Sequence, residues 1–375
     1  MNYNEESLRL HEEKQGKITL ALTVPIHTKQ DLSIAYTPGI AAVSKHVAQH
    51  PEALRTHTFV GRSVGVISNG TAVLGLGNIG AAGAYPVMEG KAALFKRFGN
   101  VDALPVVLEE TDPEKLVELI EALAINYSGI NLEDIRAPDC FYIEEELKKK
   151  LSIPVFHDDQ HGTAVVVSAA LKNSLRLLGK QLSEIKIVLS GAGSAGIAIA
   201  KLLRAQGAKK LYVLDSKGLI TQKREVNTYK KAFAVDEPAQ TLQEVIVGAD
   251  VFIGVSQPHI LRKEDVEKMK EPIIFALSNP VAEIEPEEAR AGGAKIIATG
   301  RSDHLNQINN LLVFPGLFRG LLDANITDIS QELLIEIADA LANYQEANAE
   351  AIIPSALDEK VHEVVAQTVR EYQSK

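Results

Sequence analysis

Short apolar runs alternate with amphipathic segments along the first half of the chain. The runs VGVI, ALPVVL, GINL and IPVF have the length and the apolar composition of buried strands. Between them, segments such as PEKLVELIEALAI and YIEEELKKKL repeat their apolar residues with helical spacing. Strands that alternate with helices predict βαβ units and a parallel sheet. The pattern therefore predicts an α/β unit that ends near residue 160.

A second series of apolar runs follows HDDQHGTAVVVSAALKNSLRLLGK, which has the pattern of a long amphipathic helix. The runs IKIVLS, KKLYVLD, DVFIGVS, PIIFALSNP and AKIIATG, separated by helical or loop segments, predict a doubly wound, Rossmann-type parallel sheet. Two amphipathic segments near the end of the chain, ISQELLIEIADALANYQEANA and DEKVHEVVAQTVREYQ, are expected to cover a face or to form a dimer contact. We therefore predict an N-terminal α/β substrate domain over residues 1–160 and a C-terminal nucleotide-binding domain with terminal helices over residues 161–375.

Composition and charge narrow the class of protein. The chain has 375 residues, enough for two cores, and its 46% hydrophobic and 23% charged residues are ordinary for an α/β enzyme. The formal net charge of −10 argues against a nucleic-acid or membrane partner and favours a small-molecule substrate. The single cysteine, Cys140, and the absence of an apolar leader or membrane-length run predict a cytoplasmic protein.

Two glycine sets share the GxGxxG spacing, and only the downstream set has the context of a dinucleotide site. Gly191, Gly193 and Gly196 follow a predicted strand and open a predicted helix. The next strand ends at Asp215, where a carboxylate can accept hydrogen bonds from the adenosine ribose. Such a carboxylate repels a 2′-phosphate, which favours NAD over NADP, but Lys217 nearby keeps NADP open. A doubly wound domain with an empty crevice is the alternative.

The upstream set, Gly75, Gly77 and Gly80, has no acidic residue at the end of a strand at the required distance. Pro86 is instead expected to open a helix that carries Lys91, with apolar residues one turn before and one turn after it on the same face. Burial would lower the pKa of this lysine towards values that suit a general base. The alternative is a buried stem whose ammonium group reaches solvent.

Two pairs of carboxylates follow predicted strands. Glu133 and Asp134 end the segment NLED, and Asp158 and Asp159 lie in VFHDDQHG. Strand ends on one edge of a parallel sheet converge, and four carboxylates there would suit Mg²⁺ or Mn²⁺. Each pair could instead form a solvated turn or a helix cap. The two histidines of VFHDDQHG lack the HExxH context and a cysteine pair, so we expect them to cap a helix or to support ligands rather than to bind zinc.

Together these segments resemble, in order, the signature blocks of the short bacterial malic enzymes. The blocks are AYTPGIA, GTAVLGLGNIG, PVMEGKAALFK, GINLEDI, PVFHDDQHGTA, SGAGSAG, ALSNP and ATGRSDHLNQINNLLVFPG, and the similarity runs from about Ile18 to about Ala347. The resemblance implies oxidative decarboxylation of L-malate to pyruvate and CO₂ with NAD or NADP and a divalent metal. It also implies that the upstream glycines belong to the substrate lobe and the downstream glycines bind the cofactor.

The resemblance further implies a role for each matched residue. Lys91 would take the hydroxyl proton of malate as hydride leaves, Asp158 would hold that lysine, and Tyr36 would protonate the carbon of enolpyruvate. The resemblance also implies that the metal ligands are Glu133, Asp134 and Asp159. It implies that the residues in contact with cofactor or substrate are Gly191, Gly193, Ser194, Ala195, Gly196, Asp215, Asn279 and Asn310. Asn279 is expected to serve both substrate and nicotinamide. A homodimer is expected from the resemblance and from the apolar stripes of the terminal helices.

The chain also departs from the family pattern. Many relatives have aspartate at the position of Asn69, and some have it at Asn78; His304 and Leu305 replace the usual residues of RSDYPNQ. We hypothesise that the two asparagines alter the balance between hydride transfer and decarboxylation. These departures keep a metal-dependent oxaloacetate decarboxylase as an alternative function, whereas the intact glycine loop favours the dehydrogenase. A non-catalytic nucleotide sensor or partner-binding module is disfavoured because the lysine, tyrosine and carboxylates are all present.

Overall fold

The first sheet of the computed structural model consists of four parallel strands in the order β2-β1-β3-β4. The structure describes residues 3–73, 75–238 and 240–372. The strands are β1 (Ser63–Ser68), β2 (Asp102–Val107), β3 (Gly129–Leu132) and β4 (Val155–His157), and the crossovers contain α5 (Gly80–Gly99), α6 (Pro113–Leu123), the short η2 (Ala124–Asn126) and α7 (Asp139–Lys150). The strands predicted from the apolar runs are confirmed. Helices are needed to cover both faces because every residue of β1, β3 and β4 is buried.

The second sheet is the doubly wound sheet predicted from the sequence, with the order β10-β9-β8-β5-β6-β7. Its strands are β5 (Lys186–Ser190), β6 (Lys210–Asp215), β7 (Gly218–Leu219), β8 (Val251–Gly254), β9 (Ile273–Ala276) and β10 (Ile296–Thr299), and its helices are α9 (Ser194–Ala205), α10 (Thr228–Lys231), α11 (Leu242–Val245), α12 (Lys263–Val266) and α13 (Pro286–Ala291). The chain order reverses between β5 and β8, which is where doubly wound sheets bind ligands. The short antiparallel edge strand β7, absent from the prediction, makes the sheet mixed.

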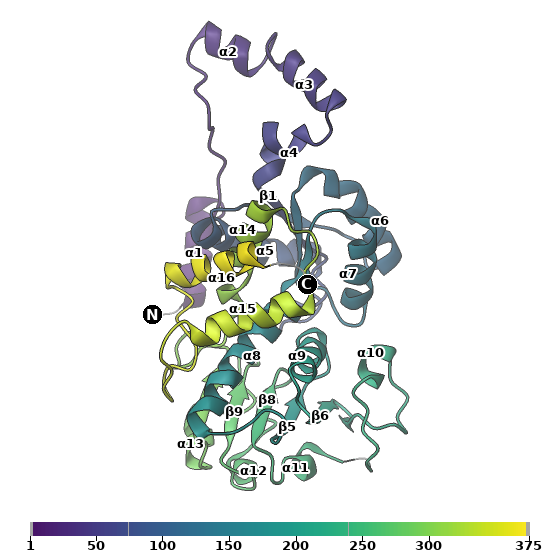
Figure 1. The fold of residues 1–375 in the computed structure, drawn as a ribbon, viewed down its shortest axis with the longest axis vertical. Coiled ribbons are helices and arrows are strands. Elements are labelled where there is room, and N and C mark those ends of the chain that lie inside the picture. Colours follow the sequence, from purple (N-terminus) through teal and green to yellow (C-terminus); the bar gives the residue numbers. More distant parts are fainter. Residues whose placement is uncertain (1–2, 74, 239, 373–375) are drawn as a thin grey trace.

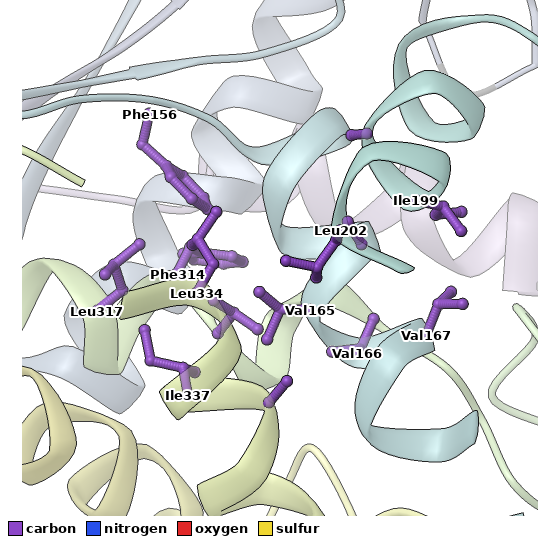
Figure 2. Close-up of a cluster of buried hydrophobic side chains, with 14 of the residues drawn as sticks. Phe156, Val165, Val166, Val167, Ile199, Leu202, Phe314, Leu317, Leu334 and Ile337 are labelled. Carbon is purple, nitrogen blue, oxygen red and sulfur yellow. The ribbon is translucent and has the colours of Figure 1, made fainter. Parts of the chain in front are cut away.

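One long helix, α8 (Asp158–Leu178), starts directly after β4 and leads to the second sheet. It is buried on nearly all sides rather than amphipathic, and it packs against α9 and α15. Figure 2 shows Val165 and Val166 of this helix beside Leu202 of α9 and close to Leu334. The larger buried cluster contains residues of both sheets, so the two lobes share a core, and a second, smaller cluster lies within the second lobe.

The C-terminal helices α14 (Phe314–Ala324), α15 (Gln331–Asn343) and α16 (Glu359–Glu371) return to the N-terminal lobe (Figure 1). The rings of Phe95 in α5 and Phe314 in α14 have centroids 4.7 Å apart. A Cβ atom at Gly316 would lie 2.3 Å from the carbonyl oxygen of His362, so this glycine allows α14 and α16 to approach closely. The two predicted terminal helices thus cover a face of the protein, and α14 is preceded by the short η3 (Asn310–Leu312).

The N-terminal segment is partly detached from the rest of the chain. After α1 (Tyr3–Lys14), residues 18–50 form a projecting arm that contains α2 (Lys29–Ala35) and α3 (Ile40–Gln49), and α4 (Ala53–His57) and η1 (Phe59–Arg62) lead back to β1 (Figure 1). Neither α2 nor α3 has a buried residue. The arm instead exposes a series of large apolar side chains: Ile18, Leu20, Leu22, Val24, Ile26, Leu32, Ile34, Tyr36 and Ile40.

One helix boundary was predicted wrongly. Pro86 was expected to open the lysine-bearing helix, but α5 begins at Gly80 and contains Pro86 in its second turn. The side chain of Asn78 accepts a hydrogen bond from the N–H of Gly80, so the helix can start at the glycine loop itself. Pro86 lies beyond the first turn of α5, so the helix lacks one of its internal hydrogen bonds at this position. Among the described residues, no helix is both long and apolar enough to span a bilayer.

Candidate functional site

The four predicted carboxylates and the predicted lysine meet at the carboxyl edge of the first sheet. Leu132 of β3 pairs with His157 of β4, so Glu133 and Asp158, which follow them directly, leave the sheet side by side. Lys91 reaches them from α5: its Nζ lies 2.6 Å from Oδ2 of Asp158 and 3.0 Å from Oε1 of Glu133. All three side chains are buried. The edge of the sheet therefore contains a lysine held between two carboxylates.

The protonation of Lys91 differs from the expectation. Burial disfavours the ammonium form, but the negative charges of Asp158 and Glu133 raise the pKa of Lys91 above its ordinary range. The ring of Phe314, whose centroid lies 4.4 Å from Nζ, adds a further favourable contact for a cation. The prediction of a lowered pKa is wrong for this arrangement. The helical pattern revealed the apolar neighbours of the lysine but not the carboxylates that arrive from β3 and α8.

Three of the carboxylates form a group with the geometry of a cation site. One oxygen from each of Glu133, Asp134 and Asp159 lies within 4.8 Å of the others. Asp134 has φ = 54°, a left-handed conformation, and its N–H donates to Oδ2 of Asp159 at 2.8 Å. Burial raises the pKa values of Glu133, Asp158 and Asp159. One lysine cannot neutralise four carboxylates, so an oxygen-binding divalent cation fits the residues present.

A buried glutamate that the sequence analysis missed supports this edge. Glu144 of α7 accepts hydrogen bonds from Nε2 of His161 at 2.8 Å and from Gln160 at 3.1 Å. Despite its burial, His161 and Lys148 hold the pKa of Glu144 well below its usual range. The glutamate thereby fixes the first turn of α8, in which Asp158 and Asp159 lie. The repetitive segment EEEL contains no signal that would have distinguished Glu144 from its exposed neighbours.

The two histidines near the carboxylates, His157 and His161, differ in their environments. His161 supports α8 through Glu144, as the sequence analysis allowed. His157 precedes α8 but its side chain does not cap the helix. It is fully buried, and burial lowers its pKa to about 4, so its ring is neutral at pH 7.

A cleft of about 1470 Å³ lies at the switch point of the second sheet, between the ends of β5 and β8. Gly191 and Gly193 line it, and Gly191 has φ = 115°. A Cβ atom at Gly196 would lie 1.9 Å from the carbonyl oxygen of Gly191, which explains the third glycine of the motif. Open space lies next to Gly193 at the start of α9, where Ser194, Ala195 and Gly196 form the first turn. A helix N-terminus beside a glycine loop suits a pyrophosphate group.

Asp215 lies at the end of β6 in the same cleft, and it is paired with cations of its own chain. Arg224 contacts both of its oxygens, at 2.8 and 3.0 Å, and Lys230 contacts Oδ2 at 3.1 Å. Although burial opposes ionisation, these contacts lower the pKa of Asp215. The sequence analysis considered only Lys217, since the loop and short helix that carry Arg224 and Lys230 match no motif.

The upstream glycine loop belongs to the first lobe and packs against the second lobe. A Cβ atom at Gly75 would lie 2.3 Å from the carbonyl oxygen of Asn279, so the loop closely approaches the SNP turn of the second lobe. On the other side of the site, a Cβ atom at Gly162 would lie 2.0 Å from Oδ1 of Asp158 and 3.1 Å from Cβ of Asn310. Asn310 thus lies near Asp158, and Asn279 lies beside the upstream loop.

The two unusual asparagines stabilise local turns. Asn69 is buried, accepts hydrogen bonds from Thr71 and donates to the carbonyl oxygen of Glu110 at 3.1 Å. Asn78 accepts from the N–H of Gly80 at 3.2 Å. Their suggested influence on the balance of the reaction stays a prediction.

Tyr36 does not join the other residues within this chain. It follows α2 in the projecting arm and is 66% exposed. Figure 1 places α2 far from α5, the helix that carries Lys91.

Comparison with known proteins gives a consistent result. Residues 15–118 match the family model described as malic enzyme, N-terminal domain, and residues 160–372 match malic enzyme, NAD binding domain. The bifunctional malic/malolactic enzyme of Bacillus subtilis (strain 168) is 48% identical, covering 98% of this chain and 92% of that protein. The NAD-dependent malic enzyme of Geobacillus stearothermophilus is 48% identical, covering 95% and 76%. The crystal structure of NAD-dependent malic enzyme from Thermotoga maritima has a TM-score of 0.94 and 46% identity, covering 97% of this chain and 99% of that one.

Proposed function

The chain belongs to the malic enzyme family, and on that premise we propose that it oxidatively decarboxylates L-malate to pyruvate and CO₂, with reduction of NAD and a requirement for Mn²⁺ or Mg²⁺. The observation that carries the proposal is the buried lysine between two carboxylates, beside a three-carboxylate group at the same sheet edge. The glycine-lined cleft supplies a separate place for a dinucleotide. A protein that merely sensed a nucleotide would have no need of the first of these sites.

Glu133, Asp134 and Asp159 would hold the cation, and the residues of the cleft would hold the nicotinamide cofactor. When bound, the cation supplies Lewis acidity at the substrate oxygen and the cofactor accepts hydride. Lys91 would accept the hydroxyl proton of malate at Nζ once the cation offsets the negative charge of Glu133 and Asp159, which favours the ammonium form of the lysine. Asp158 would fix the position of that nitrogen through the 2.6 Å contact. Asn279 and Asn310 would orient the substrate and the nicotinamide through their side-chain amides.

The position of Tyr36 supports a homodimer. The arm around this residue exposes a series of apolar side chains, and exposed apolar surface of this extent marks an interaction site. We propose that a second copy of the chain binds to this surface. In such a dimer, Tyr36 of the partner subunit would protonate the methylene carbon that remains after CO₂ leaves. This arrangement accounts for the separation of α2 from α5 in one chain. We also propose a small-molecule substrate, malate, and a cytoplasmic location, with which the free, buried Cys140 is consistent.

The test measures two reactions of the purified full-length protein with Mn²⁺. Malate-dependent formation of NADH or NADPH is followed at saturating cofactor, and loss of oxaloacetate is followed with and without cofactor. The proposal expects malate oxidation that EDTA abolishes and added Mn²⁺ restores. Metal-dependent loss of oxaloacetate without any malate oxidation would overturn it in favour of a decarboxylase.

A further inference from the structure

A buried glutamate of the second lobe lies between the loops that follow two neighbouring strands. Oε1 of Glu283 accepts from the N–H of Ser256 at 2.8 Å, and Oε2 accepts from the N–H of Ser278 at 3.0 Å. Ser256 comes two residues after β8, and Ser278 comes two residues after β9. The glutamate is fully buried. One carboxylate therefore ties together two loops at the carboxyl edge of the second sheet.

The surrounding backbone is adapted to this carboxylate. Gly254 ends β8, and a Cβ atom there would lie 2.4 Å from Cδ of Glu283, so a larger residue would displace the carboxylate. The loop after β8 is also linked to the segment that carries the glutamate. The N–H of His259 donates to the carbonyl oxygen of Ala282, and the N–H of Leu261 donates to that of Glu283, each at 3.1 Å. Side chain and backbone thus hold the same loop.

The ionised form of Glu283 suits these partners, since both are donors. Burial raises the pKa of Glu283, and the N–H groups of Ser256 and Ser278 partly offset this effect. Burying a carboxyl group is unfavourable unless it makes hydrogen bonds. A residue that only filled space here could be apolar, so the pattern of contacts indicates a role in holding the two loops.

The loop after β8 lies across the cleft from Asp215. Ser256 and Gln257 line the cleft, and Asp215 ends β6, which lies on the other side of β5 from β8 and β9. A doubly wound sheet binds a dinucleotide across this crevice, with one nucleotide on each half. With the adenosine ribose at Asp215, the nicotinamide half would lie over β8 and β9. These are the strands whose loops Glu283 holds.

The loop after β9 also reaches the first lobe. Asn279, proposed above to orient the nicotinamide, directly follows Ser278. Its carbonyl oxygen is the atom that a Cβ at Gly75 would approach to 2.3 Å. Movement of this turn would consequently change both the side chain at the cofactor and the contact between the lobes.

We propose that Glu283 is a positioning residue for the cofactor, which fixes the loops after β8 and β9 in the arrangement that receives the nicotinamide half. The inference rests on the function proposed above, because it concerns the same cofactor. Glu283→Gln keeps the size of the side chain but turns one acceptor into a donor. One of the two loop N–H groups then loses its partner, so that loop is no longer held.

The experiment measures the binding of NAD and of 5′-AMP to the full-length protein by isothermal titration calorimetry. 5′-AMP contains only the adenosine half, and neither titration requires metal, malate or turnover. Glu283→Gln should weaken NAD binding about tenfold, the factor that follows from one buried donor left without an acceptor, and 5′-AMP binding by less than about twofold. Equal weakening of both ligands, or no change in either, would overturn the proposal.

Asp250→Asn is the matched control for a general loss of stability. Asp250 is a second buried carboxylate beside β8 and accepts from the N–H of Lys186 at 2.9 Å. It precedes the strand, however, and therefore lies at the opposite edge of the sheet. The ratio of NAD affinity to 5′-AMP affinity should equal that of the wild type. A ratio lowered as far as in Glu283→Gln would contradict the positioning role.

If Glu283→Gln does not fold, Gly254→Ala decides. This variant keeps the carboxylate but displaces it, so the ratio of NAD affinity to 5′-AMP affinity should again fall; an unchanged ratio contradicts the proposal. The outcome is also separable from that of the proposed function. Malate oxidation by the wild type, with equal loss of both ligands in Glu283→Gln, would leave the function intact and remove only the positioning role. Selective loss of NAD binding in a protein that oxidises no malate would do the reverse.

Discussion

The Nζ atom of Lys91 lies 2.6 Å from Oδ2 of Asp158, and both side chains are buried although 67 positions separate them in the sequence. Lys91 comes from the middle of α5 and Asp158 from the first residue of α8. Glu133 lies 3.0 Å from the same nitrogen. The central pair of the site therefore also ties together two helices and the edge of the first sheet.

Replacing Lys91 should remove the reaction but not the cofactor site. Lys91→Met keeps the apolar stem and removes the proton acceptor, so kcat for malate oxidation should fall by about 10²–10⁴-fold. Dissociation constants for NAD, measured by calorimetry, should stay within about twofold because Lys91 is not one of the residues that line the cleft. Lys96→Met, an exposed lysine of the same helix, serves as the control. Activity of Lys91→Met within tenfold of wild type would exclude the proposed role.

Removing one carboxylate of the cation group should abolish stabilisation by metal. A cation at about 100 times its dissociation constant stabilises a folded protein by about 2.7 kcal/mol, so Mn²⁺ should raise the melting temperature of the wild type. Asp159→Asn should lose this shift, because the amide oxygen can still accept from the N–H of Asp134 but carries no charge. Asp139→Asn, which affects an ion pair with Arg136, is the matched control. Equal Mn²⁺ shifts in all three proteins would refute the assignment.

Two inactive variants should complement each other if the site is shared between subunits. Co-expressed Tyr36→Phe and Lys91→Met chains form mixed dimers, each with one intact site, so random pairing restores about a quarter of wild-type activity. If both residues acted within one chain, no mixed dimer would contain an intact site. Sedimentation velocity of each variant alone checks that dimers form. Activity of the mixture no higher than that of the separate variants would argue for a site within one chain.

His362 should make the protein less stable as the pH falls. Its ring is buried against Phe98, and its Nε2 donates to the carbonyl oxygen of Ala356. Burial lowers the pKa of His362 below its ordinary value of 6.5. Below that pH the unfolded chain binds a proton that the folded chain does not, so the free energy of unfolding falls by up to about 1.4 kcal/mol per pH unit.

The measurement compares urea unfolding of wild type and His362→Gln between pH 7.5 and about 5. The glutamine can still donate to Ala356 and does not titrate, so the pH dependence of the variant should be shallower over this interval. Identical pH dependences would mean that His362 takes up its proton equally in both states.

Cys140 should be chemically inert in the native protein. Its side chain is fully buried in α7, and burial raises the pKa of the thiol well above its ordinary range. Because the thiolate is the reactive form, native protein should react with a thiol reagent such as DTNB only through opening of the structure. Addition of urea above the unfolding midpoint should expose one thiol per chain. Rapid labelling without denaturant would show that α7 opens far more readily than its packing indicates.

The sequence alone predicted the parallel strands of both sheets and the sheet edge at which the four carboxylates lie. Strands such as β3 and β5 are apolar on both faces, and this local property is visible in any window of the sequence. The same holds for the downstream glycine loop, since the tight turn and the close approach to Val255 require residues without a Cβ atom. Parallel pairing then brings Glu133 and Asp158 to one edge, which the alternation of strands and helices already indicated.

Tertiary structure alone decided how these groups are charged and which groups are absent from the site. The protonation of Lys91, the pairing of Asp215 with Arg224 and Lys230, and the support of α8 by Glu144 all depend on distances between residues far apart in the sequence. Electrostatic interaction depends on separation and burial, neither of which periodicity reveals. For the same reason only the fold showed that Tyr36 lies on an arm away from Lys91. A motif identifies the type of a residue and its local backbone conformation, whereas the packing of the whole chain decides which side chains that residue contacts.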